Sequence, residues 1–330
     1  MTEHDNLGVH GRHDAPLDPE IAAFQRYLTA TFAAQPNLET LAPPAARALM
    51  EELRAPLARG GPVMSRTREV LIPLDAGSVR VRLHVPAGIA SPAPMLVYVH
   101  GGGWVLFSLD THDRVMREYA AGAGVVVAGV DYAHSPEARF PVALEQIVGV
   151  VRWLRSHAAD HAGDPARIAI GGDSVGANLS MAAALTLRDA GERDFVRALV
   201  LNYGVYDLDF DRPSYLKYGR AGALLTRSEM IGYWDQYLRD RTDHDNPRAR
   251  LILADVRGLP ASFLGIAEQD PLFDENMAMA QKLRSADVDA TAVVYPGTTH
   301  SYLEAVSMAE IARYAIREQS EWLRRRLIHD

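Results

Sequence analysis

The feature that most constrains the fold is a series of short, uninterrupted apolar segments with helical patterns between them. Segments such as PMLVYVH and GVVVAGVDY are apolar at nearly every position, so a strand built from either one has to be buried on both faces. Strand followed by helix, repeated along the chain, indicates βαβ units and a mostly parallel sheet. We therefore predict an α/β fold with helices on both faces of the sheet. The expected strands are residues 94–100, 124–132, 167–171, 198–201, 261–267 and 290–295, and the expected helices are residues 110–122, 141–157, 175–190, 274–286 and 305–327.

Other parts of the chain carry different patterns. Residues 66–73 and 78–86 alternate apolar and polar side chains, which predicts a β-hairpin at a sheet edge. Residues 18–34 and 43–57 have the apolar spacing of helices. Residues 206–255 contain many aromatic side chains and at least one helical pattern, but no strand pattern. We interpret this last segment as an insertion that forms a lid over the sheet.

The composition excludes several classes of function. The formal net charge is −8, and the arginines form none of the basic patches that nucleic acids require. The absence of cysteine excludes disulfides, thiolate metal sites and a cysteine nucleophile. No segment approaches the roughly 18 apolar residues of a membrane span, and the N-terminus lacks a signal-peptide pattern. We expect a cytoplasmic, soluble protein with a flexible segment over residues 1–17, whose His4, His10 and His13 form no metal site.

Ser174 lies in a G-x-S-x-G motif, residues 172–176, directly after the predicted strand 167–171. A sharp strand–turn–helix projects the serine hydroxyl, and the two glycines avoid collisions with neighbouring backbone. The start of a helix also favours a developing negative charge. The motif predicts a nucleophilic serine. The alternative is a serine that only caps a helix after a glycine-rich turn.

A second glycine-rich segment, HGGGW, occupies residues 100–104 and follows another buried strand. Consecutive glycines let several backbone N–H groups point into one small volume, where they would stabilise an oxyanion. The N–H of Val175, directly after the serine, is expected to be a further donor. A flexible loop or a phosphate-binding loop is the alternative, but the latter requires a lysine that does not follow here.

A serine hydroxyl needs a base, and in α/β-hydrolases the chain order is serine, acid, histidine. Three histidines follow Ser174, and they are His244, His300 and His329. His300 comes just after the predicted strand 290–295, at the sheet edge where open α/β sheets place their chemistry. His244 lies in a charged turn of the insertion, and His329 is the penultimate residue. We therefore predict that His300 is the base.

The acid that orients this histidine is predicted to be Asp270. It ends the segment ASFLGIAEQD, so it lies at the same edge of the sheet as His300. Glu268 and Asp274 are the alternatives. Glu268 is still within the strand, and Asp274 is expected to cap the following helix.

Five segments of the sequence resemble the hormone-sensitive-lipase-like family of carboxylesterases, the bacterial HGGG group. They are HGGGW, VDYAHSPEARFP, GDSVGANL, EQDPLFDE and YPGTTHSYL, in that family's order and spacing. The form DYxxSPEARFP is similar to bacterial acetyl esterases. The resemblance covers nearly the whole chain from about Glu69 onward. It implies an eight-stranded sheet with one antiparallel strand and a helical cap.

The resemblance also implies roles for particular residues. It implies a triad of Ser174, Asp270 and His300, with the amides of Gly102, Gly103 and Val175 as oxyanion donors. His100 would brace the glycine loop, and Asp173 and Glu137 would hold the loops around the serine. Val175 replaces the alanine that is usual in the family, which would narrow the pocket beside the serine.

The implied domain organisation is one catalytic domain with a cap. Residues 1–60 would supply cap helices and residues 206–255 the cap insertion, while residues 61–205 and 256–330 form the α/β-hydrolase core. Family members are often dimers, but no feature of this chain identifies a homodimer. Aromatic side chains of the insertion and of the glycine loop could either line a substrate pocket or form the core of the cap. The candidates for the pocket are Trp104, Tyr206, Tyr215, Tyr233 and Trp234.

Together these residues predict a serine carboxylesterase that acts on small, short-chain acyl esters through an acyl-enzyme, with no metal or organic cofactor. Two other classes share most of these features. A deacetylase, amidase or acyltransferase would use the same triad, and a comparison of ester with amide turnover would separate them. A non-catalytic ligand receptor on this fold would lack the histidine, so His300 argues against it.

Overall fold

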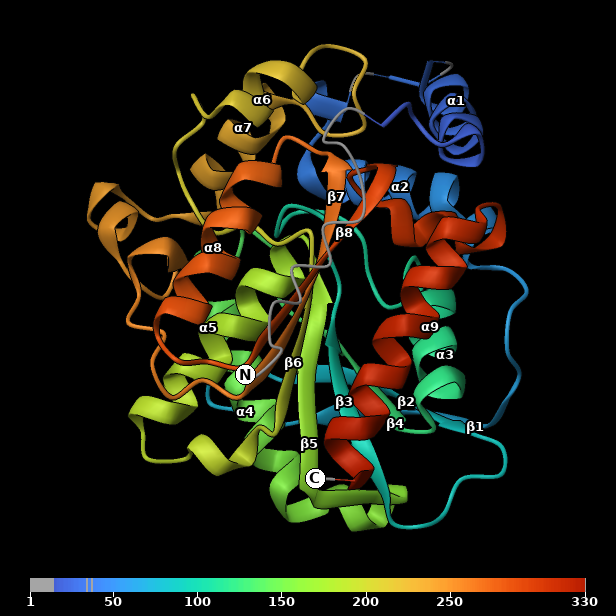
Figure 1. Ribbon diagram of the computed structural model, residues 1–330, viewed down its shortest axis with the longest axis vertical. Coiled ribbons are helices and arrows are strands. Elements are labelled where there is room, and N and C mark those ends of the chain that lie inside the picture. Colours follow the sequence, from blue (N-terminus) through green and yellow to red (C-terminus); the bar gives the residue numbers. More distant parts are fainter. Residues whose placement is uncertain (1–14, 34, 37, 330) are drawn as a thin grey trace, which may run out of the picture.

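A computed structural model describes residues 15–33, 35, 36 and 38–329 of the chain. Its eight strands form one sheet in the order β1-β2-β4-β3-β5-β6-β7-β8 (Figure 1). β2 runs antiparallel to both of its neighbours, and every other adjacent pair is parallel. The strands are β1 (Met64–Ile72), β2 (Val79–Pro86), β3 (Ala93–Val99), β4 (Val126–Asp131), β5 (Gly163–Asp173), β6 (Ala198–Asn202), β7 (Ala261–Gln269) and β8 (Ala290–Thr299). The predicted fold class and the hairpin at the sheet edge are confirmed.

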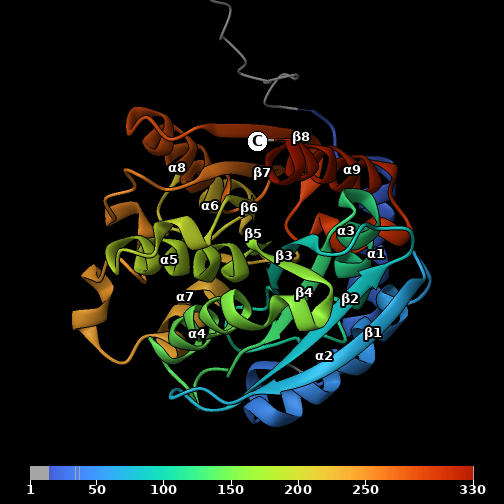
Figure 2. The same cartoon turned by 90° about the horizontal axis from the view of Figure 1, so that it is seen from below.

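Helices cover both faces of the sheet, as Figures 1 and 2 show. α3 (Asp113–Ala123) and α9 (Glu310–Arg324) pack on one face. α4 (Val142–His157), α5 (Val175–Asp189) and α8 (Phe273–Ser285) pack on the other. Every residue of the central strands β3 and β6 is buried, because apolar layers from both sets of helices close over them.

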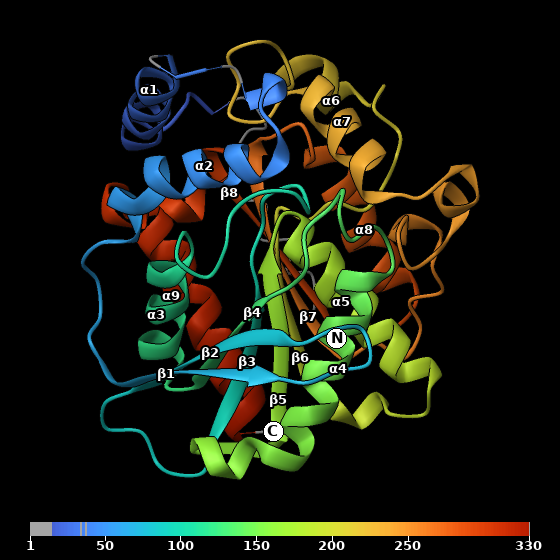
Figure 3. The same cartoon turned by 180° about the vertical axis from the view of Figure 1, so that it is seen from behind.

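Four further helices gather over the carboxyl ends of the strands (Figures 1 and 3). They are α1 (Pro19–Ala33), α2 (Pro43–Ala58), α6 (Pro213–Tyr218) and α7 (Arg227–Tyr237). α7 begins with a capping box, in which Thr226 and Glu229 satisfy each other's backbone N–H groups. α6 was not expected from the sequence, because six residues are too few for an apolar helical period to show.

Two details at helix ends differ from the prediction. The single helix expected over residues 305–327 is divided into a 3-10 helix (Tyr302–Ser307), α9 and a π turn (Arg325–His329). The backbone N–H groups of Met308 and Ala309 both donate to the carbonyl of Ala305, which closes the 3-10 helix and lets the chain turn. Asp274 does not cap α8. It lies in the first turn, and its carboxylate accepts a hydrogen bond from the Ser214 amide of α6.

The predicted flexible segment falls mostly on residues 1–14, which lie outside the described part of the chain, as do the three histidines within it. Ala15 is described, and its carbonyl accepts a hydrogen bond from Gln269 of β7. Among the helices of the described residues, none is both long enough and apolar enough to cross a bilayer.

Candidate active site

The turn between β5 and α5 holds Ser174 in an uncommon backbone conformation, with φ +55° and ψ −121°. Non-glycine residues adopt such positive φ values only where the surroundings enforce them. The surroundings here leave no room. A Cβ at Gly172 or at Gly176 would lie 2.0 Å from the carbonyl oxygen of Val99 in β3. Only glycine therefore lets β3 approach the turn that presents the hydroxyl.

Ser174, His300 and Asp270 form one hydrogen-bonded chain at this edge of the sheet. Ser174 Oγ lies 3.1 Å from His300 Nε2, and His300 Nδ1 lies 2.8 Å from Asp270 Oδ2. Because a carboxylate only accepts, Nδ1 carries the hydrogen, and Nε2 is left to accept from the serine hydroxyl. The second oxygen of Asp270 accepts from the Leu272 amide at 2.9 Å. All three side chains are buried.

The alternatives weighed from the sequence lie elsewhere. Glu268 is buried, and its carboxylate accepts a hydrogen bond at 2.7 Å from the amide of Gly297, which precedes His300 in the sequence. Asp274 contacts α6, as described above. His244 is exposed in a 3-10 helix of the insertion, and His329 belongs to the π turn after α9, at the other end of the sheet (Figure 1). Among the candidates, Asp270 is therefore the carboxylate that contacts His300.

The glycine loop after β3 lies beside Ser174. Gly102 and Gly103 have φ values of +113° and +64°, which favour glycine. A Cβ on Gly102 would lie 2.2 Å from the Leu106 carbonyl oxygen. Within the described residues, the backbone amides of Gly102, Gly103 and Val175 donate hydrogen bonds to no protein group. They are available to a ligand oxygen, and the start of α5 adds its favourable dipole.

Three residues expected to support these loops are placed as follows. The imidazole of His100 is buried, and its Nδ1 lies 2.8 Å from the Gly101 carbonyl oxygen. Asp173 Oδ1 accepts from the Gly101 amide at 3.2 Å. Glu137 is exposed and forms an ion pair with Arg47 of α2, so it joins its loop to a helix above the sheet.

His112 is a residue that the sequence analysis did not single out. It directly precedes α3 and is fully buried, with Nε2 3.4 Å from Asp173 Oδ2. Burial lowers its pKa, but the carboxylates of Asp173 and Glu304 together more than offset this, so the pKa of His112 is raised. No motif spacing links the two residues, because their contact depends on how α3 folds back across the sheet.

Above Ser174 lies a pocket of about 610 Å³. Its floor includes Ser174, His300 and the glycine loop, and its walls come from α1, α2 and the segment 219–230. Most of the wall is apolar, with side chains that include Phe32, Leu49, Met50, Leu106, Phe107, Leu224 and Met230. An apolar pocket with a few convergent polar groups is the usual form of a small-molecule site.

One polar pair crosses this wall. The guanidinium of Arg54 in α2 lines the pocket and donates to Glu304 at 2.8 Å. Glu304 lies in the 3-10 helix that follows His300, and both side chains are buried. The pair therefore connects the helix above the pocket to the segment that carries the histidine.

Of the five aromatic side chains proposed for the pocket, Tyr233 lines it and packs its ring against Gly103. Trp104 and Trp234 do not. Trp104 stacks on Tyr237 with a centroid distance of 4.1 Å and also contacts Trp234. Tyr206 and Tyr215 are buried as well and lie outside the pocket lining. These four residues take the other of the two alternatives and join an apolar core that is continuous with the core of the sheet.

Comparisons with known proteins agree with this fold. A family profile described as alpha/beta hydrolase fold matches residues 96–304. An acetyl esterase of Salmonella paratyphi B is 37% identical over 263 residues, which cover 79% of this chain and 80% of that protein.

Two solved structures are similar over nearly the whole chain. A hyperthermophilic esterase from the archaeon Pyrobaculum calidifontis superposes with a TM-score of 0.86 at 31% identity, over 94% of this chain and 98% of that one. A thermostable esterase from Pseudomonas putida superposes with a TM-score of 0.89 at 31% identity, over 95% and 98%.

The chain therefore belongs to the alpha/beta hydrolase fold family and is a carboxylic ester hydrolase. Within that family it is a hormone-sensitive-lipase-like member of acetyl-esterase type.

Proposed function

We propose that this enzyme is a serine carboxylesterase that hydrolyses short-chain acyl esters through a triad of Ser174, His300 and Asp270. The observation that carries the proposal is the hydrogen-bonded chain of these three side chains beneath an apolar pocket. The glycine loop supports it, because Gly102 and Gly103 line the same pocket as Ser174 and their amides donate to no protein group of the described residues.

The proposed reaction has two acyl-transfer steps. His300 Nε2 takes the hydroxyl proton as Ser174 Oγ attacks the ester carbonyl carbon. The amides of Gly102, Gly103 and Val175 bind the resulting oxyanion. When the tetrahedral intermediate collapses, the C–O bond to the alcohol breaks and His300 protonates the departing oxygen. Water, deprotonated by the same imidazole, then cleaves the acyl-enzyme and restores the serine hydroxyl.

Asp270 has a fixed part in this cycle. Its carboxylate keeps the hydrogen of His300 on Nδ1 and stabilises the imidazolium that forms in each step. The Leu272 amide holds the carboxylate in turn.

We also propose that residues 1–60 and 206–255 act as a cap on a core of residues 61–205 and 256–330. The position of α1, α2, α6 and α7 above the carboxyl ends of the strands supports this division (Figure 3). Pocket walls drawn from α1, α2 and residues 219–230 give the cap a part in substrate choice.

Replacement of the serine tests the proposed nucleophile. Ser174→Ala is expected to lower kcat for p-nitrophenyl acetate by roughly 10⁶-fold, because the acyl-enzyme can no longer form. Circular dichroism and the melting temperature check that the fold is intact. Full activity in a folded Ser174→Ala protein would end the proposal.

A series of p-nitrophenyl esters tests the proposed substrate class. The similarity to an acetyl esterase supports a maximum of kcat/KM between acetyl and hexanoyl esters. A maximum at dodecanoyl or longer contradicts the short-chain preference. Faster turnover of the matching anilides than of the esters would instead assign the site to an amidase.

A further inference from the structure

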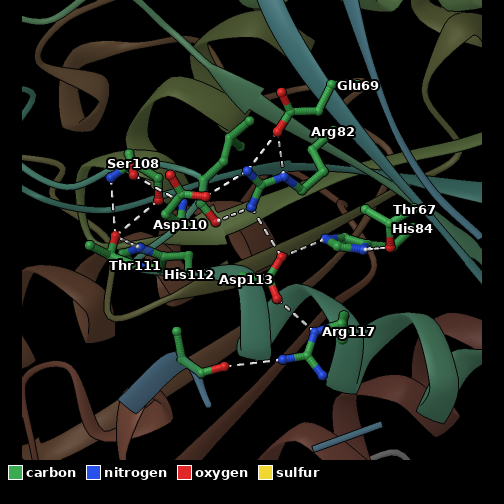
Figure 4. A network of polar contacts seen from close by, with 12 residues as sticks. Thr67, Glu69, Arg82, His84, Ser108, Asp110, Thr111, His112, Asp113 and Arg117 are labelled. Atoms are coloured by element: carbon green, nitrogen blue, oxygen red, sulfur yellow. Dashed lines mark hydrogen bonds and ion pairs between the residues drawn. The ribbon is translucent and has the colours of Figure 1, made fainter. Parts of the chain in front are cut away.

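His112 is buried beneath the glycine loop, and one of its ring nitrogens lies near a carboxylate and the other near a hydroxyl. Nε2 lies 3.4 Å from Asp173 Oδ2, and Nδ1 lies 2.9 Å from Thr111 Oγ1. Figure 4 shows the second of these contacts, with His112 and Thr111 next to each other at the start of α3. The proposed mechanism does not use this imidazole.

The contacts of Thr111 determine where the hydrogens of His112 lie. The Thr111 hydroxyl donates to the Ser108 carbonyl at 2.9 Å, so its oxygen has only acceptor capacity left for His112. Nδ1 of His112 therefore carries a hydrogen. Nε2 lies within ion-pair distance of the Asp173 carboxylate, although it makes no hydrogen bond to it. A second hydrogen on Nε2 would place the charge of an imidazolium beside the buried Asp173 carboxylate, in agreement with the raised pKa of His112.

Asp173 connects this cation to the reacting groups. Its Oδ1 accepts from the Gly101 amide at 3.2 Å and from the Tyr98 hydroxyl at 2.8 Å. A Cβ on Gly101 would lie 2.5 Å from Asp173 Oδ2, so the backbone of the loop packs directly against the carboxylate. Asp173 also immediately precedes Ser174. One buried carboxylate therefore holds the start of the glycine loop beside the serine.

We infer that His112, as an imidazolium, is a positioning residue for the oxyanion-binding amides and acts on them through Asp173. The inference rests on the proposed function, because it assigns the amides of the glycine loop to the oxyanion. Without the cation, the carboxylate would be buried and uncompensated. It would then move toward other donors, and the Gly101 amide would move with it.

Ion pairs hold the segment that carries His112 against the edge of the sheet, as Figure 4 shows. Asp110 and Asp113 both form ion pairs with Arg82 of β2, and Arg82 also pairs with Glu69 of β1. Asp113 receives a further ion pair from Arg117 of α3. These contacts on either side of His112 keep its ring against Asp173.

Charged groups on two other elements face His112. Glu304 in the 3-10 helix after His300 favours the imidazolium, and so does Glu51 of α2. Arg54 of α2 opposes it. His100 is a fourth neighbour, with ring centroids 5.6 Å apart. Burial lowers the pKa of His100 well below its usual value, so His100 is neutral and does not compete for the charge.

The sign of the pH dependence follows from the raised pKa of His112. The ion pair with Asp173 is complete below the ordinary histidine pKa and is lost as the pH rises through the raised value. The wild-type enzyme should therefore lose kcat on the alkaline side while it remains folded. If kcat stays constant as the pH rises from the ordinary histidine pKa until the protein unfolds, the inference is overturned.

A double-mutant cycle tests whether His112 acts through Asp173. His112→Gln is expected to lower kcat for p-nitrophenyl acetate by roughly 10- to 100-fold, with KM little changed, because the donors are misplaced rather than removed. Affinity for a boronic acid that mimics the tetrahedral adduct should fall by the same factor, and the alkaline loss should disappear. The double variant His112→Gln with Asp173→Asn should lose no more kcat than the more damaging of the two single variants.

His161→Gln is the matched control, because His161 is also buried but lies before β5 at the opposite end of the sheet. It should leave kcat and boronic acid affinity unchanged. Additive losses in the cycle, or a lower melting temperature with unchanged kcat, would overturn the inference and leave His112 with a structural role only. If wild-type activity survives Ser174→Ala, it is the proposed function that fails.

Discussion

The floor and the roof of the pocket are built in different ways. The floor consists of the carboxyl ends of β3, β5, β7 and β8 with the residues that follow them, and backbone packing fixes it. At Gly172 and Gly176 even one added carbon would collide with the Val99 carbonyl. The roof consists of α1, α2 and residues 219–233, and apolar side chains make up most of its inner surface. From this comparison we propose that the floor determines the chemistry and the roof determines which ester fits.

The largest effect on kcat is expected from a substitution in the floor that replaces one carboxylate oxygen by an amide nitrogen. Asp270→Asn keeps the shape of the side chain but no longer fixes the hydrogen on His300 Nδ1, so kcat should fall by about 10⁴-fold. Asp274→Asn is the matched control, because that carboxylate contacts the Ser214 amide rather than His300. Steady-state kinetics on one ester measure both. Equal losses in the two variants would remove Asp270 from the triad.

A pair of glycine substitutions compares the packing of floor and roof. Gly176→Ala should destabilise the fold by about 3 kcal/mol, since the new methyl group overlaps the Val99 carbonyl. Gly232→Ala, in α7 of the roof, meets no atom within 4 Å and should stabilise the protein by about 0.5–1 kcal/mol. Urea unfolding measures both values. The comparison fails if both variants change stability in the same direction.

A smaller effect, on the choice between esters, is expected when a larger side chain in the roof narrows the pocket. Leu49 of α2 lines the pocket and is partly buried, so Leu49→Trp should reduce the space above the serine. The ratio of kcat/KM for the hexanoyl ester to that for the acetyl ester should fall by about tenfold. Glu52→Gln, on the same helix but outside the pocket lining, is the control and should leave the ratio unchanged. An unchanged ratio in Leu49→Trp would show that the roof does not determine which ester is preferred.

The same contrast explains what could be predicted from the sequence. Buried strands need continuous apolar segments, so the order and approximate limits of β3 to β8 followed from the pattern alone. The ends of parallel strands meet at one edge, so the positions of Asp270 and His300 after their strands were enough to expect that they lie close together. Glu268, two residues before Asp270, remains within β7.

The residues of the roof could not be sorted in this way. Trp234 and Tyr233 are neighbours in α7. The rotation of this helix about its axis decides that Tyr233 faces the pocket while Trp234 joins the apolar core. The aromatic composition of the insertion is the same in either case. Arg54 and His112 were missed for a related reason, because each of them meets a carboxylate that is distant in the sequence.

The ion pair of Arg54 with Glu304 has a consequence for recombinant versions of the enzyme. Expression of only residues 96–304, the region matched by the family profile, would retain Ser174, Asp270 and His300. It would remove α2, however, and with it the cation that faces Glu304 and one wall of the pocket. A shortened enzyme that kept its triad would thus begin with a buried, uncompensated carboxylate four residues after its histidine. We therefore expect the helices ahead of the sheet to be part of the minimal catalytic unit.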